Sequence, residues 1–229
     1  MLRLIAALLM LIGGPVFAAD PDFALAPGLA FKGPQTARGA LIWLHGTYGK
    51  DEPGPPRPPD FVEREAATGL DVWCLNRGRR DDPLDRGAAR LVRAIKGLRG
   101  DGYRRVIVAG HSRGAWIALT VLAHPGLADA VVAFSPAAHG TREDRKMEAL
   151  ADWASLWASA VNNGTRAVVV QLAGDPWDPD PERRLDIARD RMGENLMAIF
   201  QPEVPTGHGG VYEPAFDEQF GAMIAAFLP

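Results

Sequence analysis

The chain has 229 residues, of which 47% are hydrophobic and 23% are charged. This length suits one compact domain, and these proportions are those of a soluble globular protein and exclude the disordered and fibrous classes. The formal net charge is −3, from 25 Lys and Arg residues against 28 Asp and Glu residues. Because the arginines are interleaved with acidic residues and no basic face stands out, nucleic-acid binding is not expected.

The first twenty residues, MLRLIAALLMLIGGPVFAAD, have the pattern of a secretory signal peptide. Arg3 precedes an apolar run from Leu4 to Ile12, and small or aliphatic residues stand three and one positions before a cut after Ala18. An uncleaved membrane anchor is the alternative, but the run is shorter than the roughly 18–20 residues that span a bilayer. We expect residues 1–18 to be removed and residues 19–229 to form a single exported domain, periplasmic or secreted, with no stable membrane anchor.

Along the rest of the chain, short apolar runs alternate with longer amphipathic ones. The apolar runs predict strands at residues 40–44, 70–75, 105–109, 130–134, 167–172 and 196–200. The amphipathic runs predict helices at residues 61–68, 84–98, 115–123, 141–161, 181–192 and 215–228, and residues 23–35 have room for one or two irregular edge strands. Apolar strands that alternate with helices indicate an α/β fold, with a mostly parallel central sheet and helices on both faces.

The motif Gly110-His111-Ser112-Arg113-Gly114 stands directly between a predicted strand and a predicted helix. Glycine two residues before and two residues after the serine allows strand and helix to approach each other around a strained turn, as in a nucleophile elbow. The helix would then begin with free N–H groups directed at the serine oxygen. A serine that merely caps the helix is the alternative, but the context favours Ser112 as a nucleophile.

A serine nucleophile needs a base and an acid, and in this architecture the acid follows the serine and the histidine follows the acid. His208 is the candidate base, because it lies on a glycine-flanked loop between the last predicted strand and the closing helix. Two carboxylates follow the strand at 167–172. We favour Asp175, three residues after the strand end, over Asp178, one turn later, although either could be a turn or cap residue.

An oxyanion hole would complete such a site. One donor is expected to be the backbone N–H of Arg113, the residue after the nucleophile. The other is expected from the loop after the first core strand, where Gly46 lets the backbone turn so that the N–H of Thr47 (or that of Tyr48) faces Ser112. His45, at the end of that strand, is expected to make structural hydrogen bonds.

The segments LIWLHG, GHSRG, LAGD and GHGG occur in the order found in the α/β-hydrolase superfamily, which the chain resembles over nearly its whole mature length. The resemblance implies an eight-stranded, mostly parallel sheet, or a truncated form of it, and a triad of Ser112, Asp175 and His208. One departure lies at the loop that carries Asp175 and Asp178, called the acid loop below. The family usually has a glycine at the strand end there, and this chain has Leu172. Dienelactone hydrolases are similar in size, but they typically carry a cysteine where Ser112 stands.

The expected reaction is therefore cleavage of a carboxylic ester or related acyl bond of a small molecule through an acyl-enzyme on Ser112. A serine peptidase of the same fold and a non-catalytic binding protein on a hydrolase scaffold are the alternatives. The sequence contains no metal-ligand spacing, phosphate-binding loop or dinucleotide fingerprint, so neither a cofactor nor a metal is expected.

Two features bear on the substrate. The segment between the fourth and fifth predicted strands holds only one long helix, so any lid is small or absent, and its Trp153 and Trp157 belong either to the core or to that lid. The arginines at positions 77, 79 and 80 follow the second core strand, where they could bind a substrate carboxylate, although pairing with Asp81 and Asp82 fits better.

Overall fold

The computed structural model describes residues 23–48, 54–78, 83–141, 143–161 and 164–229. In this part of the chain, one seven-stranded sheet runs in the order β1-β3-β2-β4-β5-β6-β7, and all neighbouring strands are parallel except β1 and β3. The strands are β1 (Phe23–Leu25), β2 (Gly39–Leu44), β3 (Leu70–Leu75), β4 (Val106–His111), β5 (Ala130–Phe134), β6 (Arg166–Gln171) and β7 (Leu196–Phe200). The predicted signal peptide, residues 1–18, lies outside the described residues.

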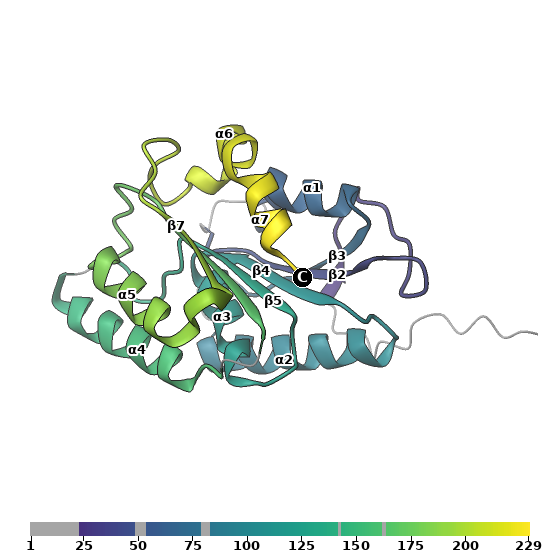
Figure 1. Cartoon of the computed structure of the whole chain (residues 1–229), viewed down its shortest axis with the longest axis horizontal. Coiled ribbons are helices and arrows are strands. Elements are labelled where there is room, and N and C mark those ends of the chain that lie inside the picture. Colours follow the sequence, from purple (N-terminus) through teal and green to yellow (C-terminus); the bar gives the residue numbers. More distant parts are fainter. Residues whose placement is uncertain (1–22, 49–53, 79–82, 142, 162–163) are drawn as a thin grey trace, which may run out of the picture.

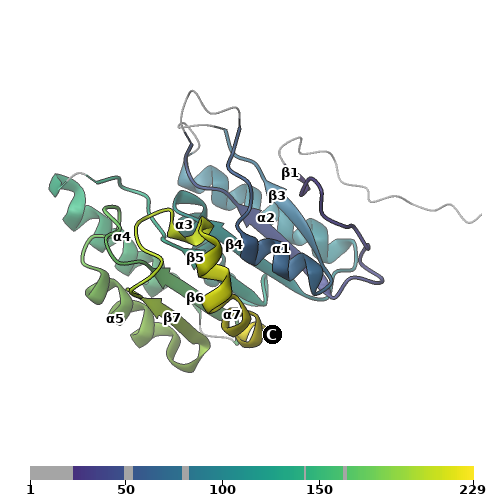
Figure 2. The ribbon, with the colours of Figure 1, turned by 90° about the horizontal axis from the view of Figure 1, so that it is seen from above.

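Helices cover both faces of the sheet, as predicted (Figure 1). The α-helices are α1 (Asp60–Ala67), α2 (Leu84–Gly100), α3 (Arg113–Leu119), α4 (Lys146–Ser159), α5 (Pro181–Met192), α6 (Pro214–Phe216) and α7 (Ala222–Phe227). One face carries α1, α6 and α7, and the other carries α2 to α5; Figure 2 shows α1 and α7 lying across the first of these faces. No helix in the described part of the chain is both long and apolar enough to cross a membrane.

Side-chain alternation along the strands divides the core into two layers. In β2, the side chains of Ala40, Ile42 and Leu44 belong to the layer under α2 to α5, whereas those of Leu41 and Trp43 belong to the layer under α1 and the C-terminal helices. All six residues of β2 are buried, because both layers are apolar and the strand lies inside the sheet. A strand that is apolar throughout is therefore what this position requires.

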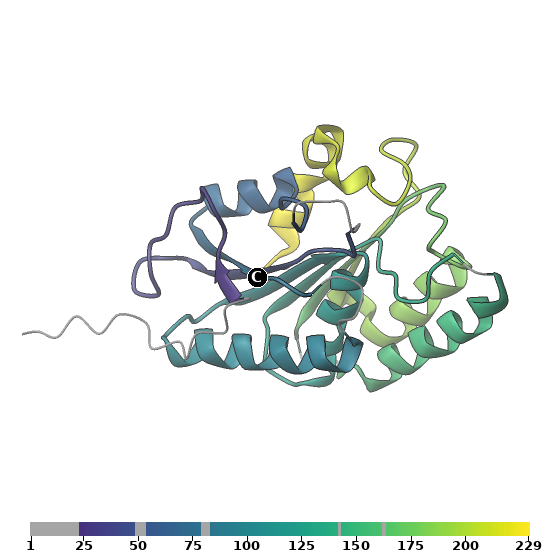
Figure 3. The same cartoon turned by 180° about the vertical axis from the view of Figure 1, so that it is seen from behind.

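The segment between β5 and β6 packs against the sheet. Trp153 and Trp157, on α4, are 0% and 1% exposed and lie in the same core layer as α2 and α3. Figure 3 shows α4 and α5 side by side on this face. The core interpretation of the two tryptophans is therefore confirmed. The predicted helix over 141–161 begins later, however: a 3₁₀ turn spans Glu143–Arg145, and the regular helix starts only at Lys146.

The predicted C-terminal helix over 215–228 is interrupted. A π-helix over Asp217–Gly221 separates α6 from α7. Within it, the Asp217 carboxylate accepts hydrogen bonds of 2.6 to 3.0 Å from the Arg64 guanidinium on α1. A Cβ at Gly221 would lie 2.8 Å from Arg64 Nε and closer still to Asp217 Oδ1, so a side chain there would displace this ion pair. The wider turn fits an ion pair between two helices, which helical periodicity alone does not reveal.

The resemblance implies a sheet of eight strands, or a truncated form of it, and the described residues form seven, with β1 a three-residue antiparallel edge strand. The six core strands lie within two residues of their predicted bounds. Because β2, β4, β5, β6 and β7 run parallel to one another, the loops that follow them gather at one edge of the sheet. That edge holds the predicted site.

Candidate active site

Ser112 occupies a strained turn between β4 and α3. Its φ is 55° and its ψ −122°, a conformation that residues with a side chain rarely adopt. Neighbouring backbone groups hold it there: the Ser112 N–H donates to Phe134 O at 2.9 Å, and the Ser112 carbonyl accepts from the N–H groups of Ala137 at 3.2 Å and Trp116 at 3.1 Å. The predicted sharp turn between strand and helix is therefore present.

The glycines of the motif stand where a side chain would collide with the backbone. A Cβ at Gly110 would lie 2.6 Å from the carbonyl carbon of Gly114, and one at Gly114 would lie 2.5 Å from His45 O and nearer still to Leu44 O. A Cβ at Gly46 would lie 3.1 Å from the Cβ of Ser112. The backbone around the serine is therefore closely packed, with β4, α3 and the loop after β2 in contact there.

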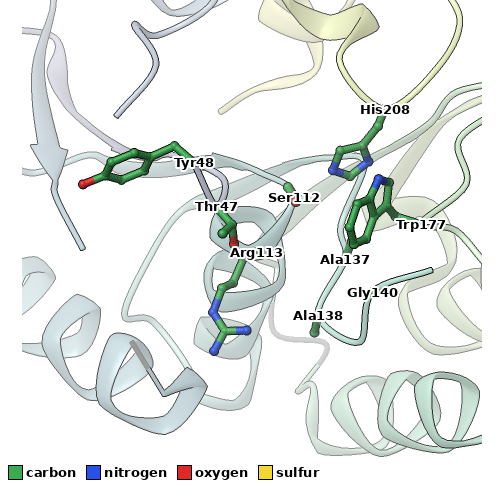
Figure 4. Close-up of a pocket in the computed structure, with 9 residues that line it drawn as sticks. All are labelled: Thr47, Tyr48, Ser112, Arg113, Ala137, Ala138, Gly140, Trp177 and His208. Atoms are coloured by element: carbon green, nitrogen blue, oxygen red, sulfur yellow. The ribbon is translucent and has the colours of Figure 1, made fainter. Parts of the chain in front are cut away.

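The structure brings His208 and Asp175 together. His208 Nδ1 lies 2.9 Å from both carboxylate oxygens of Asp175, whose side chain is only 1% exposed. The Gly207 N–H donates to Ala173 O at 2.8 Å. This hydrogen bond links the loop that carries His208, the histidine loop, to the acid loop. With Nδ1–H donated to the carboxylate, Nε2 is left as the acceptor of the ring. Figure 4 shows this ring directed towards Ser112 from the opposite side to Thr47.

Asp178, the alternative acid, faces elsewhere. Its carboxylate forms an ion pair with Arg184 on α5 and accepts a hydrogen bond of 2.8 Å from Gln171 Nε2. The Arg184 guanidinium also donates to Pro136 O at 2.8 Å and lies 4.0 Å from the centre of the Trp153 ring. Asp178 is therefore part of a buried network that joins the acid loop to α5, and Asp175 is the carboxylate beside His208.

His111, inside the motif, supports the loop that carries His208, a role that the sequence pattern does not indicate. Its Nε2 lies 2.8 Å from His208 O, and its ring lies 4.8 Å from the His208 ring and 5.0 Å from the Tyr212 ring, centre to centre. Burial, and secondarily the charge on His208, lowers the pKa of His111 to about 4. A neutral ring that donates Nε2–H to the carbonyl fits this environment, since burial disfavours the imidazolium.

Thr47 and Arg113, the predicted oxyanion donors, line one pocket together with Ser112 and His208. Arg113 is the first residue of α3, so its backbone N–H falls at the positive end of the helix dipole. The pocket has a volume of about 280 Å³, and its other walls are Tyr48, Ala137, Ala138, Gly140 and Trp177 (Figure 4). It is a small, mostly apolar pocket that both the serine and the histidine line.

No protein-family model matches the chain, and no curated protein matches it. Solved structures do. An esterase from Pyrococcus furiosus, Pf2001, has a TM-score of 0.62 and 16% sequence identity, over 85% of this chain and 83% of that one. A candidate dienelactone hydrolase from Klebsiella pneumoniae has a TM-score of 0.59 and 14% identity, over 90% of this chain and 96% of that one. An acetyl xylan esterase from Paenibacillus sp. R4 has a TM-score of 0.59 and 14% identity, over 87% of this chain and 77% of that one.

The protein has the α/β-hydrolase fold. At these identities the likeness concerns the fold, and the arrangement of Ser112, His208 and Asp175 stands on the geometry of this chain. The fold confirms the resemblance drawn from the four sequence segments.

One histidine near the pocket, His45, makes the structural hydrogen bonds predicted for it. His45 Nδ1 lies 2.6 Å from Gly46 O, and the Arg77 N–H donates to His45 Nε2 at 2.9 Å. Burial, assisted by the charge of Arg77, lowers the pKa of His45 to about 4. The Arg77 guanidinium donates to His45 O, so this arginine supports the loop after β2 and does not line the catalytic pocket. Residues 79–82 lie outside the described residues.

The structure also brings together three side chains of the types that bind metal ions, a group that the sequence does not predict. One ligand atom from each of His139, Glu148 and Asp152 lies within 4.8 Å of the others. His139 Nε2 is 2.8 Å from Asp152 Oδ2, and Arg145 donates two hydrogen bonds of 2.7 Å to Glu148. The three side chains are thus engaged in hydrogen bonds and ion pairs within the protein. Sequence spacing could not reveal the group, because a loop residue joins two helical ones.

Proposed function

We propose that the protein is a serine hydrolase that cleaves a carboxylic ester or a related acyl bond of a small molecule. The observation that carries the proposal is the contact between His208 Nδ1 and the buried Asp175 carboxylate at 2.9 Å, in a pocket that also contains Ser112 on its strained turn. A serine that only capped a helix would need neither partner. The esterases of similar fold support an ester as the substrate.

The proposed first half-reaction forms the acyl-enzyme. His208 Nε2 takes the proton of the Ser112 hydroxyl, and the serine oxygen adds to the carbonyl carbon of the ester. The carbonyl oxygen becomes an oxyanion, which the backbone N–H groups of Arg113 and Thr47 would stabilise. As the carbon–oxygen bond to the alcohol breaks, the His208 imidazolium gives its proton to the departing oxygen. Asp175 holds the ring in the required tautomer and stabilises the imidazolium.

The second half-reaction releases the acid. His208 removes a proton from water, whose oxygen adds to the acyl carbon, and the bond to Ser112 breaks as the serine oxygen recovers a proton from His208. The small pocket, about 280 Å³, favours esters with a small acyl group. We also propose that residues 1–18 are removed on export, so that residues 19–229 act as one domain in the periplasm or outside the cell. The mass of the mature protein from an exporting host tests that cleavage.

The decisive experiment is labelling with a fluorophosphonate probe, followed by mass mapping of the modified residue. Label is expected on Ser112 in the wild type and is expected to disappear in Ser112→Ala and His208→Ala. In Ser112→Ala, kcat for a p-nitrophenyl ester should fall by about three orders of magnitude or more with the fold intact. Ser155→Ala, an exposed serine on α4, is the matched control and should keep both label and activity.

Two outcomes would contradict the proposal. A folded wild-type protein that takes no label and hydrolyses no ester would favour a binding protein on a hydrolase scaffold. Efficient cleavage of peptides in preference to p-nitrophenyl esters would favour a peptidase of the same fold. A series of p-nitrophenyl esters of increasing acyl length then measures how large an acyl group the pocket accepts, and activity is expected to be highest with the shortest.

A further inference from the structure

A second cavity adjoins the catalytic pocket. It has a volume of about 220 Å³, and its walls include Thr141, Glu143, Lys146, Pro176 and Asp180. Gly140 lines both cavities, so they meet at that residue. The second cavity is more polar than the catalytic pocket, because charged side chains supply much of its wall. A ligand bound at Ser112 could therefore extend past Gly140 into a polar compartment.

Trp177 lies at the junction. The residues on either side of it, Pro176 and Asp178, line the polar cavity, whereas Trp177 itself lines the catalytic pocket. Trp177 is 39% exposed, and its ring centre lies 5.6 Å from that of His208 (Figure 4). The Trp177 N–H donates to Asp175 Oδ1 at 2.9 Å, so its backbone is fixed relative to the acid. A large exposed aromatic ring at the mouth of a pocket is a surface to which a ligand can bind.

The polar cavity offers hydrogen-bond donors and acceptors together. Lys146 Nζ lies 3.0 Å from Glu143 Oε1, which places an ammonium donor beside a carboxylate acceptor. Asp180 accepts a hydrogen bond from the Arg183 N–H through Oδ1 and has a second carboxylate oxygen, while the Thr141 hydroxyl can both donate and accept. Charges of both signs suit neutral hydroxyl groups better than an ionic ligand, because a hydroxyl both donates and accepts.

The position of His208 indicates which part of the ester reaches this cavity. In the proposed reaction, His208 protonates the departing alcohol oxygen, so the alcohol part leaves on the side of the histidine ring. Trp177 lies on that side. A ring stacked on the Trp177 indole would therefore belong to the alcohol and would continue into the polar cavity.

We propose that Trp177 and the adjoining polar cavity bind a saccharide that forms the alcohol part of the ester. The apolar C–H face of the sugar ring lies on the exposed indole, and its hydroxyl groups bond to Glu143, Lys146 and Asp180. The inference rests on the proposed function, since it assigns the substrate class of the same site. It makes the protein an esterase of acylated sugars.

The kinetic test compares an O-acetylated methyl glycoside with ethyl acetate, which has no ring. Wild-type kcat/KM is expected to be at least about tenfold higher on the sugar acetate, the gain from one aromatic contact and a few hydrogen bonds. In Trp177→Ala the ratio of the two kcat/KM values should fall about tenfold, with Trp177→Phe retaining most of it. In Lys146→Ala the ratio should fall about threefold.

Met147→Ala is the matched control, because Met147 follows Lys146 on α4, is 75% exposed and does not line the cavity. Its ratio should equal that of the wild type. A second readout is independent of the chemistry: calorimetric binding of the O-acetylated methyl glycoside to Ser112→Ala, which should weaken about tenfold when Trp177→Ala is added.

These outcomes separate the two proposals. If ethyl acetate and the sugar acetate are hydrolysed with equal kcat/KM, or if the ratio is the same in Trp177→Ala and Lys146→Ala as in the wild type, the saccharide site is wrong and the serine hydrolase stands. If Ser112→Ala binds the glycoside through Trp177 but the wild type hydrolyses no ester, the subsite stands and the proposed function fails.

Discussion

Gly114 marks the closest approach of α3 to the loop after β2. A Cβ there would overlap the backbone carbonyls of Leu44 and His45, and a backbone atom cannot rotate out of the way as a side chain can. Gly114→Ala is therefore expected to lower the free energy of unfolding by about 3 kcal/mol, through displacement of the helix from the sheet. Urea denaturation followed by circular dichroism measures this change.

Gly100→Ala is the matched control for this prediction. Gly100 also lies in a helix, at the end of α2, but a Cβ there would meet no atom within 4 Å. This substitution should leave the protein as stable as the wild type or stabilise it by up to about 1 kcal/mol, because alanine loses less backbone entropy than glycine. Equal losses in the two variants would mean that α3 does not approach the loop as closely as described.

The sequence predicts the serine and the histidine of the candidate site more firmly than the acid. Ser112 lies in a motif whose glycines follow from local sterics, and the place of His208 in the chain order leaves it few rivals. Asp175 and Asp178 lie on one turn, and the feature that separates them is the buried Arg184 beside Asp178. That pairing depends on how α5 packs against the acid loop, which no local pattern records.

At the scale of the elements, a buried ion pair between Arg184 and Asp178 joins α5 to the acid loop. The Arg184 side chain is 1% exposed and that of Asp178 is 5% exposed, and burial opposes the charge of both, lowering the pKa of Arg184 and raising that of Asp178. Removal of one partner leaves the other charge buried and unpaired. Arg184→Met is expected to lower the free energy of unfolding by about 3–5 kcal/mol, as measured by urea denaturation.

Arg183→Met provides the control, since Arg183 is the exposed neighbour on the same helix. It should change the free energy of unfolding by less than about 0.5 kcal/mol. The double variant Arg184→Met with Asp178→Leu should recover part of the loss, because no unpaired charge then stays in the core. If Arg184→Met were as stable as the wild type, the ion pair would not be what joins α5 to the acid loop.

Some of the helices and strands can be predicted from a local sequence pattern, and others cannot. Strands such as β3 and β5 coincide with their predicted bounds, because an apolar run bounded by polar or glycine residues is enough to define a strand buried on both faces. The apolar periodicity predicts a continuous C-terminal helix and gives no sign of the π-helix that interrupts it. The contact that this turn makes, between Arg64 and Asp217, joins residues 153 positions apart.

At the scale of the whole molecule, two buried histidines make stability depend on pH. His45 and His111 are 3% and 7% exposed, and burial lowers the pKa of each to about 4 from an ordinary value of 6.5. Between these values the unfolded chain binds protons that the folded protein does not bind, so acid favours unfolding. The stabilisation from both histidines is complete above about pH 6.5 and is lost as the pH falls towards 4.

The free energy of unfolding is therefore expected to fall by up to about 2.7 kcal/mol per pH unit between about pH 6 and pH 4.5, which corresponds to two protons. Buried carboxyl groups with raised pKa values, such as that of Glu65, act in the opposite direction, so the comparison between variants isolates each histidine.

His111→Asn should reduce the slope by about 1.4 kcal/mol per pH unit, as measured by urea denaturation at half-unit steps of pH. Tyr212→Phe alters the same cluster without removing a group that titrates in acid, so it should keep the wild-type slope. An unchanged slope in His111→Asn would mean that the buried His111 ring takes up its proton as readily in the folded protein as in the unfolded chain.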